Sequence, residues 1–411
     1  MTSRLTLDPD YELFCNQQLQ DPYPLLARLR DEQPVHWCEP MKMWLVTRYD
    51  DVLMGLKETK RLVSSRDRMY TDPLTPENRE LARPLVEHIG RWMQNLNPPD
   101  HTRNRKLVSQ VFTPRMLQGL KPRIEQIVSE LLDDVCAQHE TDFYRSFCLP
   151  FPAMVICEML GIPRQDQDRY HETLERLFPF SGAAGPALND AVGAARQAMD
   201  ELLVYFDRLI EQRRKDPQDD LISTMAAAEA NGDRLSRDEL FALCVFLYNA
   251  GHETTVSLLS SGTLLLLRHP DQFKMLQADL DSLLEPAIEE FLRYEPAVPR
   301  AVRVPVEPYR FGAYIVPQGQ TIMMLLSAAN RDPDVFSDPD RFDITRWPNK
   351  HLGFGHGIHF CLGAPLARLE ANIAFRAIVE RLSNMQLATD QVHWQSLAGL
   401  RSVAALPVHI P

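Results

Sequence analysis

Apolar residues recur at three- and four-residue spacing along most of the chain, which is the period of an α-helix packed on one face. The segments that show this period are 22–31, 50–58, 116–136, 194–214 and 237–267. The last of these is apolar nearly all round, as expected of a helix that passes through the middle of a large protein. The pattern therefore predicts a mainly helical fold.

Strand patterns are short and lie near the two ends of the chain. The runs 35–37 and 43–46 flank a turn around Glu39-Pro40, and the segment 309–326 contains Gly312 and a Pro317-Gln318-Gly319 turn, which predicts hairpins. No Gly/Ser-rich linker, low-complexity block or internal repeat divides the sequence. We therefore expect a mainly α protein with a small β portion, organised as a single domain over residues 1–411.

Composition narrows the class of protein. The 411 residues are 45% hydrophobic and 24% charged, and 44 basic against 56 acidic residues give a net charge of −12, which argues against nucleic acid as a partner. Seven cysteines without paired spacing suit a reducing compartment. The first residues hold no apolar stretch, and His252-Glu253 interrupt the tract 237–267, so we expect no membrane anchor and a cytoplasmic location.

The segment 353–365 carries the most specific chemistry in the chain. Cys361 lies among glycines, just ahead of the predicted helix 366–372, whose N-terminal N–H groups and dipole favour a thiolate. The glycines allow a flat ligand to approach the backbone, Phe354 and Phe360 offer aromatic surface, and His359 can donate a hydrogen bond to an anionic edge. Together these residues indicate haem held by cysteine. The alternative is a buried structural cysteine in a glycine-rich turn.

The spacing Phe354-x-x-Gly357-x-His359-x-Cys361-x-Gly363 resembles the haem-binding signature of the cytochrome P450 superfamily. The resemblance covers nearly the whole chain. It implies the cytochrome P450 fold, with haem b between the long helix 237–267 and the helix after Cys361, and with the Cys361 thiolate as axial ligand of the iron. It also implies that Phe354, Gly355, His359 and Gly363 contact the cofactor.

The run Ala250-Gly251-His252-Glu253-Thr254-Thr255 interrupts the long apolar helix with polar residues and a glycine. It resembles the family segment that binds dioxygen, which implies contacts from Ala250 and Gly251, a hydrogen-bonding hydroxyl on Thr254 and a proton relay through Glu253. The alternative is a threonine bonded to its own helix carbonyl beside a surface glutamate. His252 is given no role.

Cations for the haem propionates are implied by a second set of matches. His101 and Arg105 lie four residues apart on one face of a helix that starts near Pro98-Pro99-Asp100, and Arg303 and His359 complete the set. Arginine suits this task because its planar fork can pair with both carboxylate oxygens. The alternative for His101 and Arg105 is a basic surface cluster.

Glu290 and Arg293 resemble the family's Glu-x-x-Arg element, an i, i+3 pair that forms a structural ion-pair network. Arg341 is the candidate for the third member of the network. The expected role of these residues is in folding and not in chemistry.

By the same resemblance, the substrate pocket is lined by the segment before His101 and by residues 177–186, 246–250, 297–302 and 397–400. Arg300 places a charge where apolar residues commonly face the haem. It can serve an anionic or carrier-tethered substrate, or it can point to solvent. The identity of the small-molecule organic substrate is left open.

The reading as a whole is a monooxygenase that hydroxylates or epoxidises an organic small molecule, in keeping with secondary metabolism. Separate ferredoxin and ferredoxin reductase chains would supply electrons, with the ferredoxin docking near Cys361 at Arg103, Lys106 and Arg115. Three alternatives stay open at this point: a peroxide-driven peroxygenase of the same fold, a non-catalytic recruitment module, and a redox or metal-binding protein that uses several cysteines.

Overall fold

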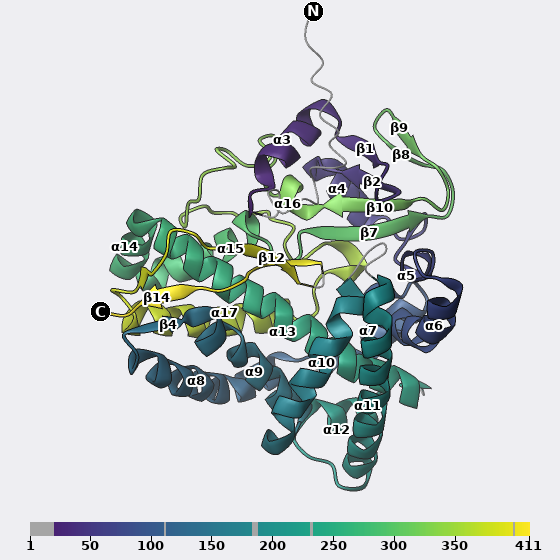
Figure 1. The fold of residues 1–411 in the computed structure, drawn as a ribbon, viewed down its shortest axis with the longest axis horizontal. Helices are drawn as coiled ribbons and strands as arrows, with labels where there is room; N and C mark the ends of the chain where they lie inside the picture. The colour runs from purple at the N-terminus through teal and green to yellow at the C-terminus, as the bar shows by residue number, and fades with distance from the viewer. Residues whose placement is uncertain (1–19, 111, 183–187, 231–232, 398) are drawn as a thin grey trace, which may run out of the picture.

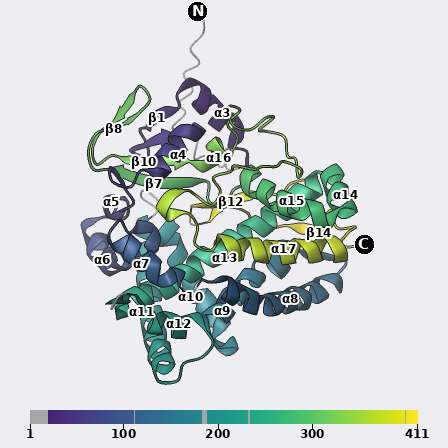
Figure 2. The same ribbon diagram turned by 180° about the vertical axis from the view of Figure 1, so that it is seen from behind.

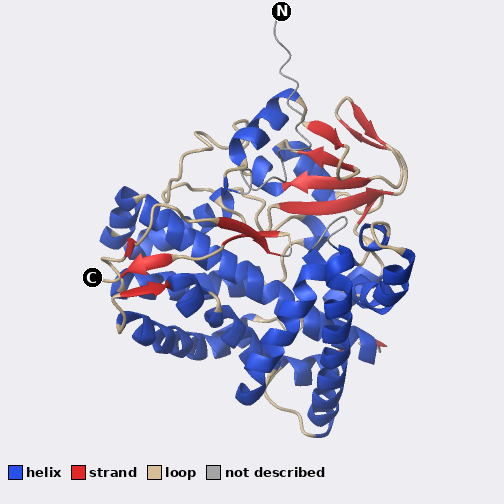
Figure 3. Cartoon of the chain, viewed as in Figure 1, coloured by secondary structure: helices blue, strands red, loops and turns tan. Residues whose placement is uncertain are grey.

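Helices form most of the computed structural model, with the strands gathered mainly at one end of the molecule (Figure 3). The structure describes residues 20–110, 112–182, 188–230, 233–397 and 399–411. The helices are α3 (Tyr23–Glu32), α4 (Tyr49–Lys57), α5 (Asp67–Thr71), α6 (Pro76–Gly90), α7 (Asp100–Ser109), α8 (Pro114–Cys136), α9 (Pro150–Leu160), α10 (Gln167–Gly182), α11 (Leu188–Lys215), α12 (Leu221–Ala227), α13 (Arg237–Arg268), α14 (Pro270–Ala278), α15 (Leu280–Tyr294), α16 (Leu326–Ala329) and α17 (Ala364–Arg381).

Short helical turns and strands complete the fold. The turns are η1 (Met93–Asn95), η2 (Tyr144–Cys148), η3 (Arg164–Asp166) and η5 (Gly357–His359). The strands are β1 (Val35–Cys38), β2 (Met43–Val46), β3 (Leu62–Val63), β4 (Glu140–Asp142), β5 (Glu229–Ala230), β6 (Asp233–Arg234), β7 (Arg300–Pro305), β8 (Tyr309–Phe311), β9 (Tyr314–Val316), β10 (Thr321–Leu325), β11 (Gln386–Leu387), β12 (Trp394–Leu397), β13 (Leu400–Val403) and β14 (Pro407–His409). The mainly α fold with a small β portion is as predicted.

Helix α13 crosses the middle of the molecule (Figure 1). It begins at a capping box, in which the Ser236 hydroxyl accepts from the Glu239 N–H and the Glu239 carboxylate accepts from the Ser236 N–H. Gly262 lets α15 and α17 approach closely, because a Cβ there would lie 2.5 Å from the Phe375 ring and 2.9 Å from the Phe291 ring. Helices α9, α15 and α17 all pack on α13, and α17 lies alongside it when the molecule is seen from behind (Figure 2).

The larger sheet has the strand order β1-β2-β10-β7-β3. Strands β1 and β2 form the predicted hairpin, with Val35 opposite Val46. The prediction of hairpins through 309–326 is right only for β8 and β9. Residues Thr321–Leu325 instead form β10, which pairs parallel with β2 and antiparallel with β7, because its buried apolar side chains belong to the core under the sheet.

Some elements escaped the sequence prediction. Helices α6, α9 and α10 were not expected, and each has a physical reason to be missed. Proline lies inside α6 at Pro84 and inside α10 at Pro179, and α9 is apolar on nearly every side because it is buried. Among the helices that the structure describes, none is long and apolar enough to span a membrane. The N-terminal segment and part of 177–186 and 397–400 lie outside the described residues.

A buried ion pair holds the irregular segment that follows α16. The Arg293 Nε and Nη2 atoms lie 2.7 and 2.8 Å from the two Glu290 carboxylate oxygens, and both side chains are fully buried. Arg293 also donates to the carbonyl oxygens of Asn330, Pro339 and Arg341. The structure thus brings Glu290 and Arg293 together as predicted.

The third charged member of this network is Arg346, and the prediction of Arg341 is wrong. Arg346 Nε lies 3.3 Å from a Glu290 carboxylate oxygen, whereas Arg341 contributes only its backbone carbonyl. The Glu290 carboxylate also accepts from the Asp343 N–H and the Asn349 side-chain amide, each at 3.0 Å. The course of the irregular backbone between α16 and Asn349 determines which arginine reaches the Glu290 carboxylate. That course cannot be predicted from the spacing of residues in the sequence.

We predict that Glu290→Gln destabilises the protein by about 3–5 kcal/mol, because it leaves the Arg293 guanidinium buried without a counter-charge. Arg346→Gln is expected to lower the free energy of unfolding more than Arg341→Gln. Denaturant unfolding followed by circular dichroism measures both effects. Arg196→Gln, which breaks an i, i+4 pair on the surface of α11, is the control and should cost about 0.5 kcal/mol or less. Equal losses in the Arg341 and Arg346 variants would contradict this assignment.

Candidate functional site

Cys361 lies in the loop between η5 and α17, at the N-terminal side of the helix that packs on α13. The Cys361 N–H donates to the Phe354 carbonyl at 2.9 Å, which closes the glycine-containing loop. Gly355 and Gly357 in this loop have φ of 68° and 71°, a conformation that favours glycine. Gly363, two residues beyond the cysteine, would place a Cβ only 3.9 Å from the Cys361 Sγ atom.

The protonation state of Cys361 differs from the sequence expectation. Burial raises the pKa of the Cys361 thiol, and this effect exceeds the opposite effects of the Gly363 and Ala364 N–H groups and of Arg105 and Arg368. The backbone groups at the start of α17 therefore favour the thiolate as predicted, but they do not suffice by themselves. A metal cation bound by Cys361 would supply the missing stabilisation, since a coordinating thiol loses its proton outright.

Ion pairs formed by Glu289 flank the cysteine loop on both sides in the sequence. The Arg368 guanidinium lies 4.6 Å from the centre of the Phe354 ring and donates to both carboxylate oxygens of Glu289, at 2.6 and 2.8 Å. Glu289 also contacts His351 Nε2 at 2.9 Å. Burial alone would raise the pKa of Glu289, but hydrogen bonds from Arg368 and His351 outweigh it and lower the pKa to about 2. The sequence analysis missed this trio because its members lie on three separate segments.

The cations predicted for the propionates gather on one side of Cys361. His101 and Arg105 lie on α7, and the His101 ring lies 4.3 Å from the His359 ring, centre to centre. Arg105 donates to the Phe360 carbonyl at 2.7 Å. Arg303 lies on β7, is 4% exposed, and donates only to its neighbour's carbonyl, at Val302. The structure thus brings all four predicted residues to one cluster.

Burial decides the charge of this cluster. It lowers the pKa of His101 to about 4 and that of His359 to about 2, and the nearby arginines act in the same direction. Both imidazoles are therefore neutral hydrogen-bond donors at neutral pH, and the positive charge resides on Arg105 and Arg303. Burial also lowers the pKa of Arg303 to about 10, with Arg66 adding to the effect.

This cluster tests whether the residues present fit haem. Both ring nitrogens of His101 are buried and have no hydrogen-bond partner, and among the residues that the structure describes no acidic side chain offsets the charge of Arg303. A buried guanidinium and an orphaned imidazole need an anion, since unpaired buried polar groups are costly. Two carboxylates entering beside Cys361 meet that need, so the residues fit the propionates of haem. Arg66, which the sequence analysis did not single out, adds charge beside Arg303.

One face of α13 carries accessible residues. Phe246, Ala250 and Thr254 recur every four residues and stay accessible, while most of the helix around them is buried. The Thr254 hydroxyl donates to the Ala250 carbonyl at 2.7 Å, and Thr255 makes the same bond to Gly251 at 3.0 Å. Thr254 therefore makes the bond to its own helix carbonyl that the sequence analysis gave as the alternative. Its face of the helix nevertheless stays accessible.

The other polar residues of this segment lie elsewhere on the helix. Glu253 is 8% exposed, and His252 is fully buried behind it. Gly251 packs toward α9, because a Cβ there would lie 3.3 Å from the Ile156 side chain. The structure therefore places Ala250 and Thr254 on the open face, and Gly251 at its edge against a neighbouring helix.

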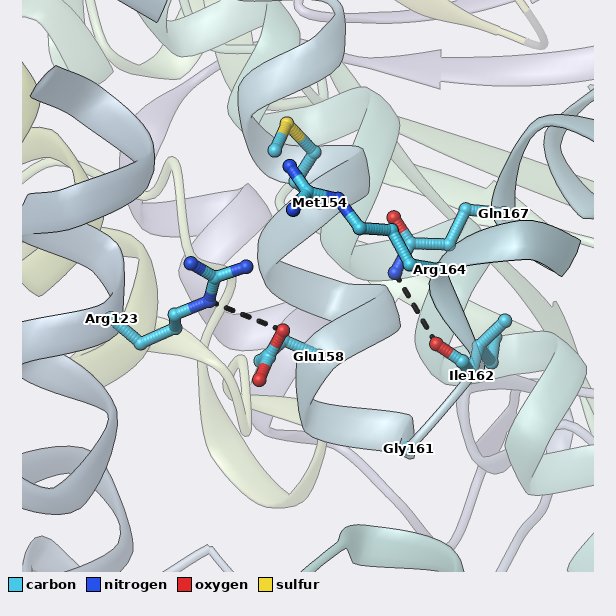
Figure 4. Close-up of a pocket in the computed structure, with 7 residues that line it drawn as sticks. All are labelled: Arg123, Met154, Glu158, Gly161, Ile162, Arg164 and Gln167. Carbon is cyan, nitrogen blue, oxygen red and sulfur yellow. Dashed lines mark hydrogen bonds and ion pairs between the residues drawn. The ribbon is translucent and has the colours of Figure 1, made fainter. Parts of the chain in front are cut away.

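A hollow of about 270 Å³ on another part of the molecule is unrelated to this site (Figure 4). Its lining residues come from α8, α9 and the turn before α10, and Arg123 there pairs with Glu158 at 3.3 Å. None of its lining residues comes from α13, α7 or the cysteine loop. It carries no part of the chemistry described above.

A cysteine in a glycine-containing loop at the start of α17, beside a buried cationic cluster, is the arrangement of a haem-thiolate protein. The model of the family described as Cytochrome P450 matches residues 41–395. The polyketide biosynthesis cytochrome P450 PksS of Bacillus subtilis is 38% identical over 404 residues, which are 95% of this chain and 96% of that protein. The cytochrome P450 monooxygenase PikC of Streptomyces venezuelae is 40% identical over 94% and 91% of the two chains.

Solved structures agree with these relatives. The structure of P450BioI in complex with an acyl carrier protein ligated to hexadec-9Z-enoic acid superimposes with a TM-score of 0.87 at 34% identity, over 96% of this chain and 99% of that one. The chain belongs to the cytochrome P450 family. It has that family's fold and its haem-thiolate cofactor, haem b with a cysteine as axial ligand, and it is a monooxygenase.

Glu370 is a buried carboxyl group on α17 that the sequence analysis did not identify. It is 3% exposed and contacts the Thr255 hydroxyl of α13. Burial raises the pKa of Glu370 to about 8, and the Thr255 contact opposes this only in part. The side chain is therefore protonated at neutral pH in the folded protein and ionised at that pH in the unfolded chain.

We predict that Glu370 makes the folded state less stable as the pH rises from about 5 to 8. The folded protein holds a proton that the unfolded chain has lost, so the free energy of unfolding falls by up to about 1.4 kcal/mol per pH unit over this window. Urea unfolding midpoints at several pH values measure the slope. Glu370→Gln should flatten it, whereas Glu380→Gln, at an exposed position of the same helix, should not. A slope that Glu370→Gln leaves unchanged would contradict the assignment.

Proposed function

We propose that the protein hydroxylates or epoxidises an organic small molecule of secondary metabolism, using dioxygen as oxidant. The observation that supports this proposal is the accessible face of α13, where Phe246, Ala250 and Thr254 stay open while most of the helix is buried. An acid and an alcohol stand side by side there as Glu253 and Thr254. Dioxygen chemistry needs two protons per turnover, and this pair can hold and pass them.

Each residue of the site has a proposed role. Cys361 is the axial ligand, with Phe354, Gly355 and Gly363 shaping the loop that carries it. His101, Arg105, Arg303 and His359 hold the propionates by hydrogen bonds and charge. The bound haem supplies the activation of dioxygen. Ala250 would leave room on the accessible face of α13, with Gly251 at its edge. The Thr254 hydroxyl oxygen, whose hydrogen is held by the Ala250 carbonyl, would accept a hydrogen bond there, and Glu253 would deliver protons.

The same residues argue against two of the alternative functions. A peroxide-driven peroxygenase of this fold has no need of an acid–alcohol pair, because peroxide brings its own protons. A non-catalytic recruitment module has no need of an open face on α13 or of a cysteine loop held by Glu289. This chain keeps both features, which supports oxygen activation over either alternative.

Two relatives carry names that point to the metabolism of organic small molecules. PksS is named for polyketide biosynthesis, and the 6-deoxyerythronolide B hydroxylase of Saccharopolyspora erythraea, named for its reaction, is 38% identical over 400 residues. These names support a substrate of similar kind. Arg300, on β7, is the residue that we propose to distinguish an anionic or carrier-tethered substrate from a neutral one. Burial lowers the pKa of Arg300, with Arg66 adding to the effect, and no acidic side chain among the described residues opposes it.

Electrons come, in this proposal, from a separate ferredoxin and ferredoxin reductase in the cytoplasm, with the chain acting as a single domain over 1–411. The docking surface lies beside Cys361, where Lys106 and Arg115 are exposed and Phe360 is 40% exposed. Arg103 already pairs within this chain, since it donates to Glu239 at 2.5 Å and to the Arg234 carbonyl at 2.7 Å, so its charge is offset before any ferredoxin docks. We therefore assign the electrostatic part of docking to Lys106 and Arg115 alone.

The spectrum of the reduced protein under carbon monoxide tests the haem-thiolate assignment. We expect the strongly red-shifted Soret band that is typical of thiolate ligation, and we expect Cys361→Ser to lose it. Ser is close to Cys in size, so the variant tests ligation with little change in packing. Cys157→Ser, at a buried cysteine of α9, is the control and should keep the band. A band that survives in Cys361→Ser would contradict the proposed ligand.

Charge reversal tests the docking surface. Lys106→Glu and Arg115→Glu should together slow the reduction of the haem by an acidic ferredoxin about tenfold at low salt, and the difference should shrink as salt rises. Stopped-flow absorbance measures the rate. Lys215→Glu, an exposed charge at the far end of α11, should leave the rate unchanged. Equal rates for all variants, or a loss that does not depend on salt, would rule out this surface.

A further inference from the structure

The arginines around the haem site carry more positive charge than haem would neutralise. Haem brings two carboxylates, and the cluster that fits them already holds two positive charges, on Arg105 and Arg303, because burial keeps both of its imidazoles neutral. Arg300, at the start of β7, and Arg66, ahead of α5, add two more. In the part of the chain that the structure describes, no acidic side chain offsets Arg300 or Arg303. A further anion would therefore stabilise this part of the molecule.

The geometry of β7 keeps Arg300 apart from the propionate cluster. Arg300 and Arg303 lie three residues apart on this strand, and both are within its antiparallel pairing with β10. Three residues of a strand span about 10 Å, and an odd separation turns the two side chains to opposite faces. After burial and Arg105, it is the charge of Arg303 that lowers the pKa of His101. Arg300 is thus placed for a different anion.

Arg66 lies near the start of the same strand. Strand β3 pairs antiparallel with the end of β7, with Val63 opposite Val304, so the chain beyond β3 runs back toward the start of β7. Helix α5, which Arg66 precedes, lies near one end of β7 in both ribbon views (Figure 1, Figure 2). Burial is the main cause of the lowered pKa of Arg300, and the charge of Arg66 is the other. The two guanidinium groups are therefore neighbours, although they repel.

A tyrosine, and not an acid, contacts the Arg66 side chain. The Tyr70 hydroxyl accepts from Arg66 and donates to the Ser181 carbonyl at 3.1 Å. The Tyr70 ring stacks on Phe180, near the end of α10, with 5.9 Å between the ring centres. Arg66 Nε is buried and has no hydrogen-bond partner. The contact with Tyr70 thus positions Arg66 and leaves it a donor that is still unused.

The Arg300 side chain faces a space inside the protein. It keeps accessible surface, whereas Val302 and Arg303 on the same strand are buried. Protein nevertheless surrounds Arg300 closely enough for burial to lower its pKa. Surface that is accessible and yet enclosed by protein lines an internal space. A molecule that enters this space meets a guanidinium without a counter-charge.

We propose that Arg300 and Arg66 bind the carboxylate of an acidic substrate and so fix one end of that substrate beside β7. This inference deepens the proposed function and rests on it. The planar fork of an arginine can donate two parallel hydrogen bonds to a carboxylate. An acyl group tethered to a carrier as a thioester has an uncharged carbonyl, which gains little from two guanidinium groups. The arrangement therefore favours a free carboxylic acid as the substrate class.

Matched ligands test this preference for charge without turnover. Dodecanoic acid and dodecanamide have the same chain and nearly the same shape, and only the acid is charged at neutral pH. The change in the Soret band of the ferric protein on titration gives the Kd of each ligand. We expect the acid to bind about tenfold tighter than the amide. Arg300→Gln should bring the ratio of the two Kd values close to one, and Arg66→Gln, at a half-buried position, should lower it about threefold.

Control variants and a second anion sharpen the assignment. Arg68→Gln in α5 and Arg310→Gln in β8 remove exposed arginines of nearby elements and should leave the ratio unchanged. Dodecyl phosphate represents the phosphate of a carrier arm. If it binds tighter than dodecanoic acid and loses this advantage in Arg300→Gln, the site recognises phosphate and the assignment to a carboxylate is wrong. Equal affinity of the unmodified protein for the acid and the amide would also overturn the proposal.

Two further readouts separate substrate binding from a role in folding or in holding haem. Because Arg300 has no counter-charge, Arg300→Gln should keep or raise the unfolding midpoint of the substrate-free holoprotein. It should also leave the rate of haem transfer to apomyoglobin unchanged, whereas Arg303→Gln should speed that transfer. A lower midpoint would assign Arg300 to folding, and a faster transfer would assign it to a propionate. Either result would refute the substrate site.

Oxidation of the same ligands distinguishes this inference from the function on which it rests. With dioxygen, a ferredoxin and its reductase, we expect hydroxylated dodecanoic acid to form faster than hydroxylated amide. If both are oxidised and neither binding nor rate favours the acid, the proposed function stands and the anion site is wrong. If the acid binds with the predicted dependence on Arg300 but electrons and dioxygen are consumed without hydroxylated product, the anion site stands and the proposed oxidation is wrong.

Discussion

Two consecutive glutamates on α15 hold the loop that carries Cys361. Glu290 is buried with Arg293, and it also accepts from Asp343, Arg346 and Asn349, which lie in the irregular segment ahead of the loop. Glu289, its neighbour, binds His351 within that segment and Arg368 beyond the cysteine. Because Glu290 and Arg293 are fully buried and Glu289 is nearly so, losing a partner would leave a buried charge uncompensated. The position of the thiol therefore depends on carboxylates that never touch the cofactor.

The cost of a buried, uncompensated charge also governs the haem site. The chain as a whole is acidic, but the cluster beside Cys361 gathers Arg105 and Arg303, with His101 and His359 held neutral by burial. This concentration of positive charge is costly without a counter-ion. Binding a dianionic cofactor removes that cost and supplies the cation that Cys361 needs as a thiolate. Cofactor binding and folding are therefore linked, so that haem stabilises the native state by mass action.

The sequence predicted what depends on local spacing. The Cys361 loop, the His101–Arg105 face, the Glu290–Arg293 pair and the long helix α13 are all found as expected, because each rests on neighbours within a few residues. What depends on the path of irregular backbone was not predictable. Arg346 and not Arg341 reaches Glu290 because the segment after α16 turns that way. Strand β10 joins β2 and β7 instead of forming a hairpin because its apolar residues belong to the core.

The pKa shifts and contacts of buried polar residues were the features least predictable from the sequence. The N–H groups at the start of α17 pointed to a thiolate at Cys361, but the depth of burial, which spacing does not reveal, reverses the net direction of the thiol pKa. His252 received no role because its neighbours, Leu149 and His171, lie 103 and 81 residues upstream in the sequence. Helix α13 thus divides its polar residues by face. Ala250 and Thr254 stay accessible, His252 packs against His171 of α10, and the Glu253 carboxylate lies beside the His252 ring.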